Sequence, residues 1–106
     1  MESMYAKPLK VKDLVEYQSG SVVSREIIRK ETGTLTLFAF DAGQGLSEHT
    51  APFDAVVEIF DGEALITVAG KPIIANNGDM VIMPAEVPHS LMAEKRFKML
   101  LTMIKK

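Results

Sequence analysis

The sequence contains no cysteine and only two histidines, His49 and His89. The absence of cysteine excludes disulfide frameworks, thiolate zinc sites, iron–sulfur clusters and cysteine nucleophiles. Two histidines limit any metal site to two imidazole ligands per chain, so carboxylates, backbone oxygens or water would have to supply the other ligands. Long apolar runs are also missing, because no uncharged run approaches the ~18–20 residues that span a bilayer.

Basic residues are scarce in the centre of the chain. Residues 32–94 contain one base, Lys71, against nine acidic side chains. Phosphate backbones bind clustered lysine and arginine, so we expect no nucleic-acid partner. The segment Met1–Tyr5 lacks the basic-then-apolar layout of a signal peptide. Together with the missing apolar runs, this predicts a cytoplasmic protein with no membrane partner.

The 106 residues are enough for one domain, and 47% of them are apolar, which is enough to fill a core. Short alternating or β-branched segments follow one another at intervals of about ten residues, separated by glycine turns, and this predicts an all-β sandwich or barrel. The pair Asp61-Gly62 is typical of a tight hairpin. We expect one short helical turn over 10–15 and strands over 22–30, 34–40, 55–60, 63–69, 72–75, 80–83, 90–93 and 97–104.

Both histidines are expected at strand starts, where they can converge across a small barrel. Five residues separate Gly43 from His49, and five separate Gly78 from Pro84, which precedes His89. This spacing resembles the two conserved-barrel motifs of the cupin superfamily. The resemblance covers roughly residues 34–105. It implies a cupin-type double-stranded β-helix, or jelly-roll barrel, for 34–105, with residues 1–33 adding an N-terminal helical turn and an outer strand to a single domain, 1–106.

The sequence departs from those motifs at two of the four metal-ligand positions. Ala51 stands where the family has its second histidine, and Ala55 where it has a glutamate. The second-motif glycine is Glu86, and the terminal asparagine is Ala93. Of the family's usual four ligands only His49 and His89 remain, and two small apolar residues leave space instead of replacement ligands.

The nearby acids are poor substitutes for the missing ligands. If Ala55 points inward, strand alternation turns Asp54, Val56 and Glu58 outward. Glu48 faces away beside His49 for the same reason. Glu86 lies on the loop before His89 and is either a solvent-facing acid or one that reaches the barrel mouth. The remaining site would hold a divalent ion such as zinc, nickel, manganese or iron only weakly.

A mainly apolar pocket follows from this composition. We expect it to be lined by His49, Ala51, Ala55, Val57, Ile59, His89 and Ala93, with the two histidines as its few polar groups. Either histidine is also a candidate acid or base, because imidazole can serve as both near neutral pH. Met80 and Met83 lie on a segment expected to be buried on both faces. These two and three later methionines are either core filler or a pliable pocket lining.

Three hypotheses remain open at this point. The first is a small-molecule-binding cupin with a two-histidine remnant of the metal site. The second is a metal-dependent isomerase, dioxygenase or sugar-acid-processing enzyme that uses His49, His89 and water. The third is a dimeric, non-catalytic sensing module. A homodimer is expected in each case, because small cupins are commonly dimers and because the outward residues Val56 and Phe60 are apolar.

Overall fold

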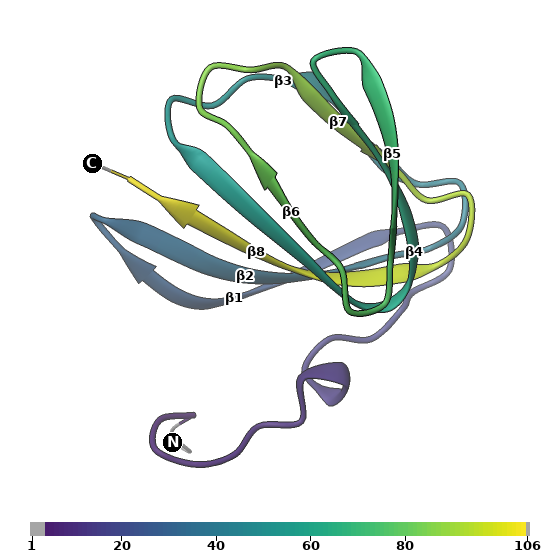
Figure 1. The fold of residues 1–106 in the computed structure, drawn as a ribbon. Helices are drawn as coiled ribbons and strands as arrows, with labels where there is room; N and C mark the ends of the chain where they lie inside the picture. Colours follow the sequence, from purple (N-terminus) through teal and green to yellow (C-terminus); the bar gives the residue numbers. More distant parts are fainter. Residues whose placement is uncertain (1–3, 106) are drawn as a thin grey trace.

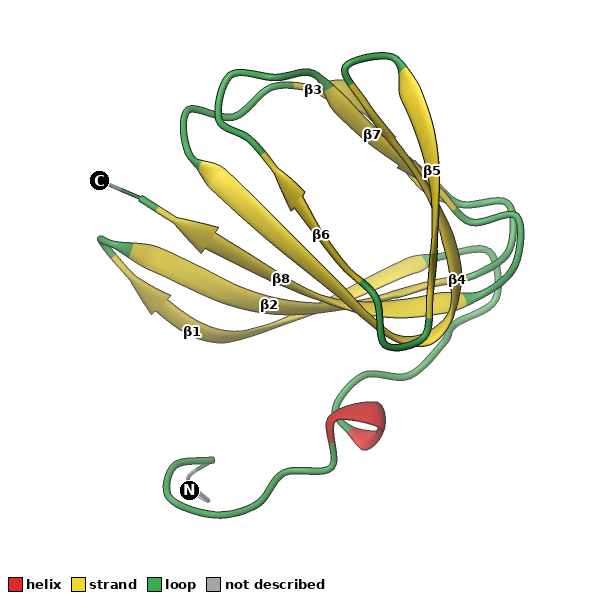
Figure 2. Cartoon of the chain, in the orientation of Figure 1, coloured by secondary structure: helices red, strands yellow, loops and turns green. Residues whose placement is uncertain are grey.

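A computed structural model describes residues 4–105; Met1–Ser3 and Lys106, at the ends of the predicted domain, lie outside the described residues. Within this range the chain forms one short 3-10 helix and eight strands (Figure 2). Their bounds are η1 Val11–Asp13, β1 Val22–Lys30, β2 Gly33–Phe40, β3 Gly45–His49, β4 Asp54–Val68, β5 Lys71–Asn76, β6 Met80–Met83, β7 His89–Met92 and β8 Phe97–Ile104. The predicted all-β class with an N-terminal helical turn is therefore confirmed. No helix in this part of the chain is long and apolar enough to cross a membrane.

The strands form a curled sheet with two layers (Figure 1). All pairs are antiparallel, in the order β1-β2-β8-β4-β7-β3, and β5 and β6 also pair with β4. The first half of β4 pairs with β8 and β6, and its second half pairs with β7 and β5. This one long strand therefore joins the two layers of the barrel.

Gly62 allows β4 to pass from one layer to the other. The register of β4 against β8 shifts between Ile59 and Asp61, and Gly62 has a φ of 76°. A Cβ atom there would overlap the carbonyl oxygen of Arg96. The tight hairpin predicted at Asp61-Gly62 is therefore wrong, because this pair lies within a continuous strand, directly after a bulge between Ile59 and Asp61. The bulge gives β4 its bend.

Two further expectations about strands need correction. The structure contains a strand, β3, where the sequence suggested only a glycine turn, and His49 ends this strand instead of preceding one. The segment 80–83 is not buried on both faces, since Met80 and Ile82 are 59% and 60% exposed. Val81 and Met83 alternate with them and face the core, so only one face of β6 is buried.

The inner face of the barrel holds the main core. Ala55, Val57 and Ile59 point inward and are buried, whereas Asp54 and Glu58 are exposed, which confirms the predicted alternation. The rings of Phe40 and Phe97 stack at 4.4 Å between centroids and are fully buried. These residues belong to one cluster that joins both layers.

A second, smaller core lies outside the barrel. Residues 11–17, which we call the strap, cross the outer face of the sheet, where Val15 packs with Leu37 and Ala39. Phe60 packs against the same cluster. It was expected to lie at a subunit interface, but the chain's own strap covers it.

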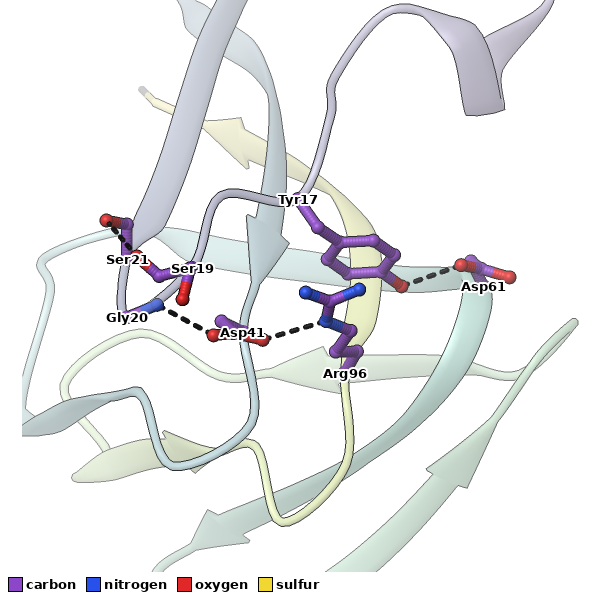
Figure 3. A network of polar contacts seen from close by, with 7 residues as sticks. All are labelled: Tyr17, Ser19, Gly20, Ser21, Asp41, Asp61 and Arg96. Carbon is purple, nitrogen blue, oxygen red and sulfur yellow. Dashed lines mark hydrogen bonds and ion pairs between the residues drawn. The ribbon is translucent and has the colours of Figure 1, made fainter.

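Polar contacts anchor the strap at both ends. Lys98 is buried, and its Nζ donates to the carbonyl oxygen of Lys12 at 2.7 Å. The Tyr17 hydroxyl donates to Asp61 at 2.6 Å, and the Arg96 guanidinium lies 4.9 Å from the centre of the Tyr17 ring (Figure 3).

Asp41 joins this network to the chain that follows the strap. One Asp41 oxygen accepts from Arg96 at 2.8 Å, and the other accepts from the backbone N–H of Gly20 at 2.7 Å (Figure 3). These hydrogen bonds, that from Arg96 above all, hold the pKa of Asp41 below its ordinary value. The strap is therefore tied to the end of β2 and to the turn before β8.

Substitution of the bend glycine tests its role in β4. Gly62→Ala should lower the free energy of unfolding by about 3–4 kcal/mol, because left-handed backbone and overlap with the Arg96 carbonyl both oppose a Cβ atom. Gly70→Ala is the matched control: its φ is also positive but the space around it is open, so it should cost only about 1–2 kcal/mol. Urea unfolding measures both values, and equal losses would contradict the close-approach argument.

The Tyr17–Asp61 contact predicts a loss of stability in alkali. Burial, and then the hydrogen bond to Asp61, raise the pKa of Tyr17 above its ordinary value. The folded chain therefore keeps this proton at a pH where the unfolded chain loses it, so stability falls as the pH rises above about 10. Tyr17→Phe should reduce that fall. Urea unfolding between pH 8 and 11 measures it, and parallel curves for the two proteins would count against this contact.

Candidate functional site

The two histidines meet where β3 ends and β7 begins. Antiparallel pairing places His49 directly opposite His89. Their Nε2 atoms are 3.2 Å apart, the ring centroids are 4.4 Å apart, and the ring planes cross at 70°. His89 is only 4% exposed, whereas His49 is exposed, so one ring lies within the barrel and the other at its mouth.

A backbone carbonyl fixes each ring through its other nitrogen. Nδ1 of His49 lies 2.8 Å from the carbonyl oxygen of Ser47, and Nδ1 of His89 lies 3.1 Å from that of Val87. A carbonyl only accepts hydrogen bonds, so this geometry assigns a proton to both Nδ1 atoms. In neutral rings both Nε2 atoms are then acceptors, and they lie 3.2 Å apart. A proton, a metal ion or a donor group of a ligand would complete this arrangement.

A small apolar cavity lies beside the histidine pair. Its volume is about 50 Å³, which is room for about one or two water-sized groups. Its wall includes His89, three methionines and three leucines from four different strands. The full lining is Leu46, His49, Ala51, Ala55, Met83, His89, Leu91, Met99, Leu101 and Met103.

The structure brings together four of the seven residues expected to line a pocket. His49, Ala51, Ala55 and His89 all contribute to this cavity. Val57, Ile59 and Ala93 do not, because they are buried deeper in the cluster that contains Phe40 and Phe97. Successive inward positions on a strand are about 7 Å apart, so Val57 and Ile59 lie beyond this small cavity.

Sequence reasoning missed the lining residues on β8 and β6. Met99, Leu101 and Met103 alternate along β8 and face the cavity, and Met83 ends β6. The sequence signal that could have identified them was the high frequency of methionine near the end of the chain. It did not separate these residues from Met80 and Met92, which are exposed on the outside.

The acids near the histidines do not complete a metal site. Asp54 points outward and accepts a hydrogen bond from the backbone N–H of Ala85 at 2.9 Å. Glu48, Glu58 and Glu86 are exposed, and Glu86 has a left-handed φ of 66° where the cupin motif has glycine. Residues 4–105 contain no group of three or more histidine, cysteine or acidic side chains that could hold an ion.

The histidine pair itself fits two positions around an ion. Two nitrogens each about 2.0–2.1 Å from one metal, at common coordination angles, lie roughly 3 Å apart, close to the 3.2 Å between the two Nε2 atoms. The other two family positions, Ala51 and Ala55, line the cavity without a donor group. A catalytic zinc site keeps three protein ligands, so the described residues do not fit a tightly held ion.

Comparisons with known proteins show which solved structures share this arrangement of strands. A conserved protein of unknown function from Streptococcus pyogenes is 32% identical, with a TM-score of 0.92 over 100% of this chain and 96% of that protein. A cupin superfamily protein from Desulfitobacterium hafniense is 28% identical, with a TM-score of 0.91 over 98% of this chain and 95% of that protein. No protein-family model and no curated protein matches the sequence.

A third neighbour is longer. A cupin 2 conserved barrel domain protein from Leptotrichia buccalis is 41% identical over 89% of this chain, with a TM-score of 0.87. The match covers 46% of that protein, so this chain spans about half its length.

The two-ligand geometry predicts weak, exchangeable metal binding. Protein purified without a histidine tag should contain much less than one zinc, nickel, manganese or iron ion per chain by elemental analysis. Zinc should raise the thermal midpoint only at high concentration, because stabilisation grows with the ratio of ligand concentration to Kd. His49→Ala should abolish that rise. One retained ion per chain that disappears in His49→Ala would contradict the prediction.

Proposed function

Because the chain is a small cupin domain, we propose that it binds a small organic molecule at the mouth of its barrel. The molecule has an apolar body and one hydrogen-bond donor, such as a hydroxyl group. The observation that carries this proposal is the pair of Nε2 atoms 3.2 Å apart beside an apolar cavity, with each ring held by a carbonyl at Nδ1.

The hydrogen-bond donor of the proposed ligand is inferred from the two histidine rings, neither of which has a proton to donate at Nε2. Both Nε2 atoms are acceptors when both Nδ1 atoms carry the proton. Leaving a buried acceptor without a donor costs about 1–3 kcal/mol, and His89 is buried. A hydroxyl group beside the two Nε2 atoms would donate to one of them. A ligand without a donor would leave both acceptors unpaired.

The apolar body follows from the rest of the lining. Apart from the histidines, every side chain around the cavity is alanine, leucine or methionine. Met83, Met99 and Met103 have flexible side chains that adapt to the shape of a ligand. A cavity of about 50 Å³ can therefore widen toward its mouth, where His49 is exposed.

A metal-dependent enzyme is the second candidate. The 3.2 Å separation favours it, because two imidazoles bound to one ion have a similar separation. Such an ion would need water or ligand oxygens in the positions that Ala51 and Ala55 leave without donors. It would supply a Lewis acid to an isomerase, a dioxygenase or a sugar-acid-processing enzyme.

Matched pairs of small molecules test the preferred proposal. Phenol and cyclohexanol should bind about tenfold more tightly than toluene and methylcyclohexane, which have similar shapes without the hydroxyl group. Methyl resonances of Met83, Met99 and Met103 should shift on titration, because these side chains line the cavity. Met80 and Met92 are the internal controls, since they are exposed outside the barrel.

A variant of His49 separates the contribution of the histidine pair from that of the apolar lining. His49→Ala should remove most of the preference for the hydroxyl compound while keeping weak binding of the apolar one. Equal affinity for phenol and toluene in the unmodified protein would contradict the donor argument. Binding of hydroxyl compounds only in the presence of an added ion would instead favour the metal-dependent candidate.

A further inference from the structure

The inner face of the sheet continues past the cavity as one row of side chains. Residues that pair directly in antiparallel strands have their side chains on the same face, so the strand register defines this row. It runs from β6 to β1 through Met83, Ala55, Met103, Thr34 and Arg29. The first three line the cavity beside the histidine pair. Thr34 is the next position, on β2, and neighbouring strands lie about 5 Å apart (Figure 1).

Strand alternation also places the Thr34 side chain on the inner face. Phe40 lies an even number of positions later on β2 and points into the main core, whereas Leu37 points outward to the strap. Thr34 also borders a hollow around Gly33 on the outer face. Its side chain points to the opposite face, because it shares that face with Met103.

The Thr34 hydroxyl group is buried without a hydrogen-bond partner. Thr34 is 4% exposed, and its Oγ1 atom has no partner within residues 4–105. Most buried hydroxyl groups in proteins are hydrogen-bonded, because an unpaired one costs stability. Thr34 therefore offers a hydrogen-bonding group that the folded chain does not itself use, one strand away from the cavity.

Met103 separates Thr34 from the cavity. Thr34 does not line the cavity, since Met103 occupies the position between them. The Met103 side chain is only partly buried, and methionine is unbranched, with three bonds about which it rotates. Rotation of this one side chain would join the cavity to Thr34 without a change in the backbone.

The last position of the row favours a neutral ligand group over a carboxylate. Arg29 lies on β1, and its Nε atom is 3.1 Å from a carboxylate oxygen of Glu26. This ion pair compensates the charge of the guanidinium group. The Thr34 hydroxyl is then the donor closest to the cavity in this row, because alanine and methionine side chains have no hydrogen-bond donor.

We propose that Thr34 is a second polar contact of the ligand site and donates a hydrogen bond to a neutral carbonyl oxygen of the ligand. This inference rests on the proposed function, in which a hydroxyl group of the same ligand donates to the histidine pair. The two contacts are complementary, since the histidines accept and the threonine donates. The ligand is therefore a hydroxy carbonyl compound, such as a hydroxy ketone, whose apolar body displaces the Met103 side chain.

Paired alcohols and hydroxy ketones test the second contact. The probes are 5-hydroxy-2-pentanone, 6-hydroxy-2-hexanone and 7-hydroxy-2-heptanone, each compared by NMR titration with the 1-alcohol of the same chain length. The best-fitting hydroxy ketone should bind about tenfold more tightly than its alcohol, because it adds one hydrogen bond. Thr34→Val should remove this preference, and Thr34→Ser should keep it. Thr67→Val is the matched control, because Thr67 follows the buried Ile66 and points outward.

The stability of the ligand-free protein gives an independent measurement. Thr34→Val should raise the thermal midpoint more than Thr67→Val does, because it removes a buried hydroxyl group that has no partner. A hydroxyl group with a structural role would instead lower the midpoint when removed.

Two kinds of failure are distinguishable. A lower midpoint in Thr34→Val, or a hydroxy ketone preference that survives in this variant, would overturn the role of Thr34. Hydroxy ketones that bind no better than alcohols would do the same while leaving the proposed function intact. Alcohols that bind no better than alkanes of the same length would contradict the proposed function, and the role of Thr34 with it.

Discussion

The structure depends on one continuous strand that belongs to both layers of the barrel. β4 pairs with β8 and β6 before Gly62 and with β7 and β5 after it. The bend at Gly62 needs a left-handed backbone and close approach to the Arg96 carbonyl, which only glycine accommodates without strain. Because this strand curves, the inward side of its first half and the β3–β7 pair face the same interior.

The candidate site follows from this curvature. β3 and β7 bring His49 and His89 into register, and Ala55 on β4 and the methionines of β8 form the wall that they face. Carbonyls fix both rings at Nδ1, so both Nε2 atoms, which lie 3.2 Å apart, are acceptors in neutral rings. Ala51 and Ala55 line the cavity without donor groups, so this acceptor pair lies beside an apolar wall.

The sequence predicted the general arrangement well because its signals were local. Alternation placed Ala55 and Val57 inward, and motif spacing placed the two histidines together. The sequence-based prediction was wrong at Gly62, because the role of this glycine depends on a distant segment: a Cβ atom there would overlap the carbonyl oxygen of Arg96. The sequence also did not predict β3, because four of its five residues are exposed. It placed Phe60 at a subunit interface, whereas the strap covers this side chain.

The central claim is that both histidines carry their proton on Nδ1 and present bare Nε2 atoms to a shared donor. Nitrogen NMR of the imidazole rings tests this most directly, because long-range couplings assign the protonated nitrogen in each ring. The account predicts a protonated Nδ1 in both His49 and His89. A bare Nδ1 in either ring would turn the contact at 3.2 Å into an ordinary hydrogen bond between the two histidines, and the acceptor pair would not exist.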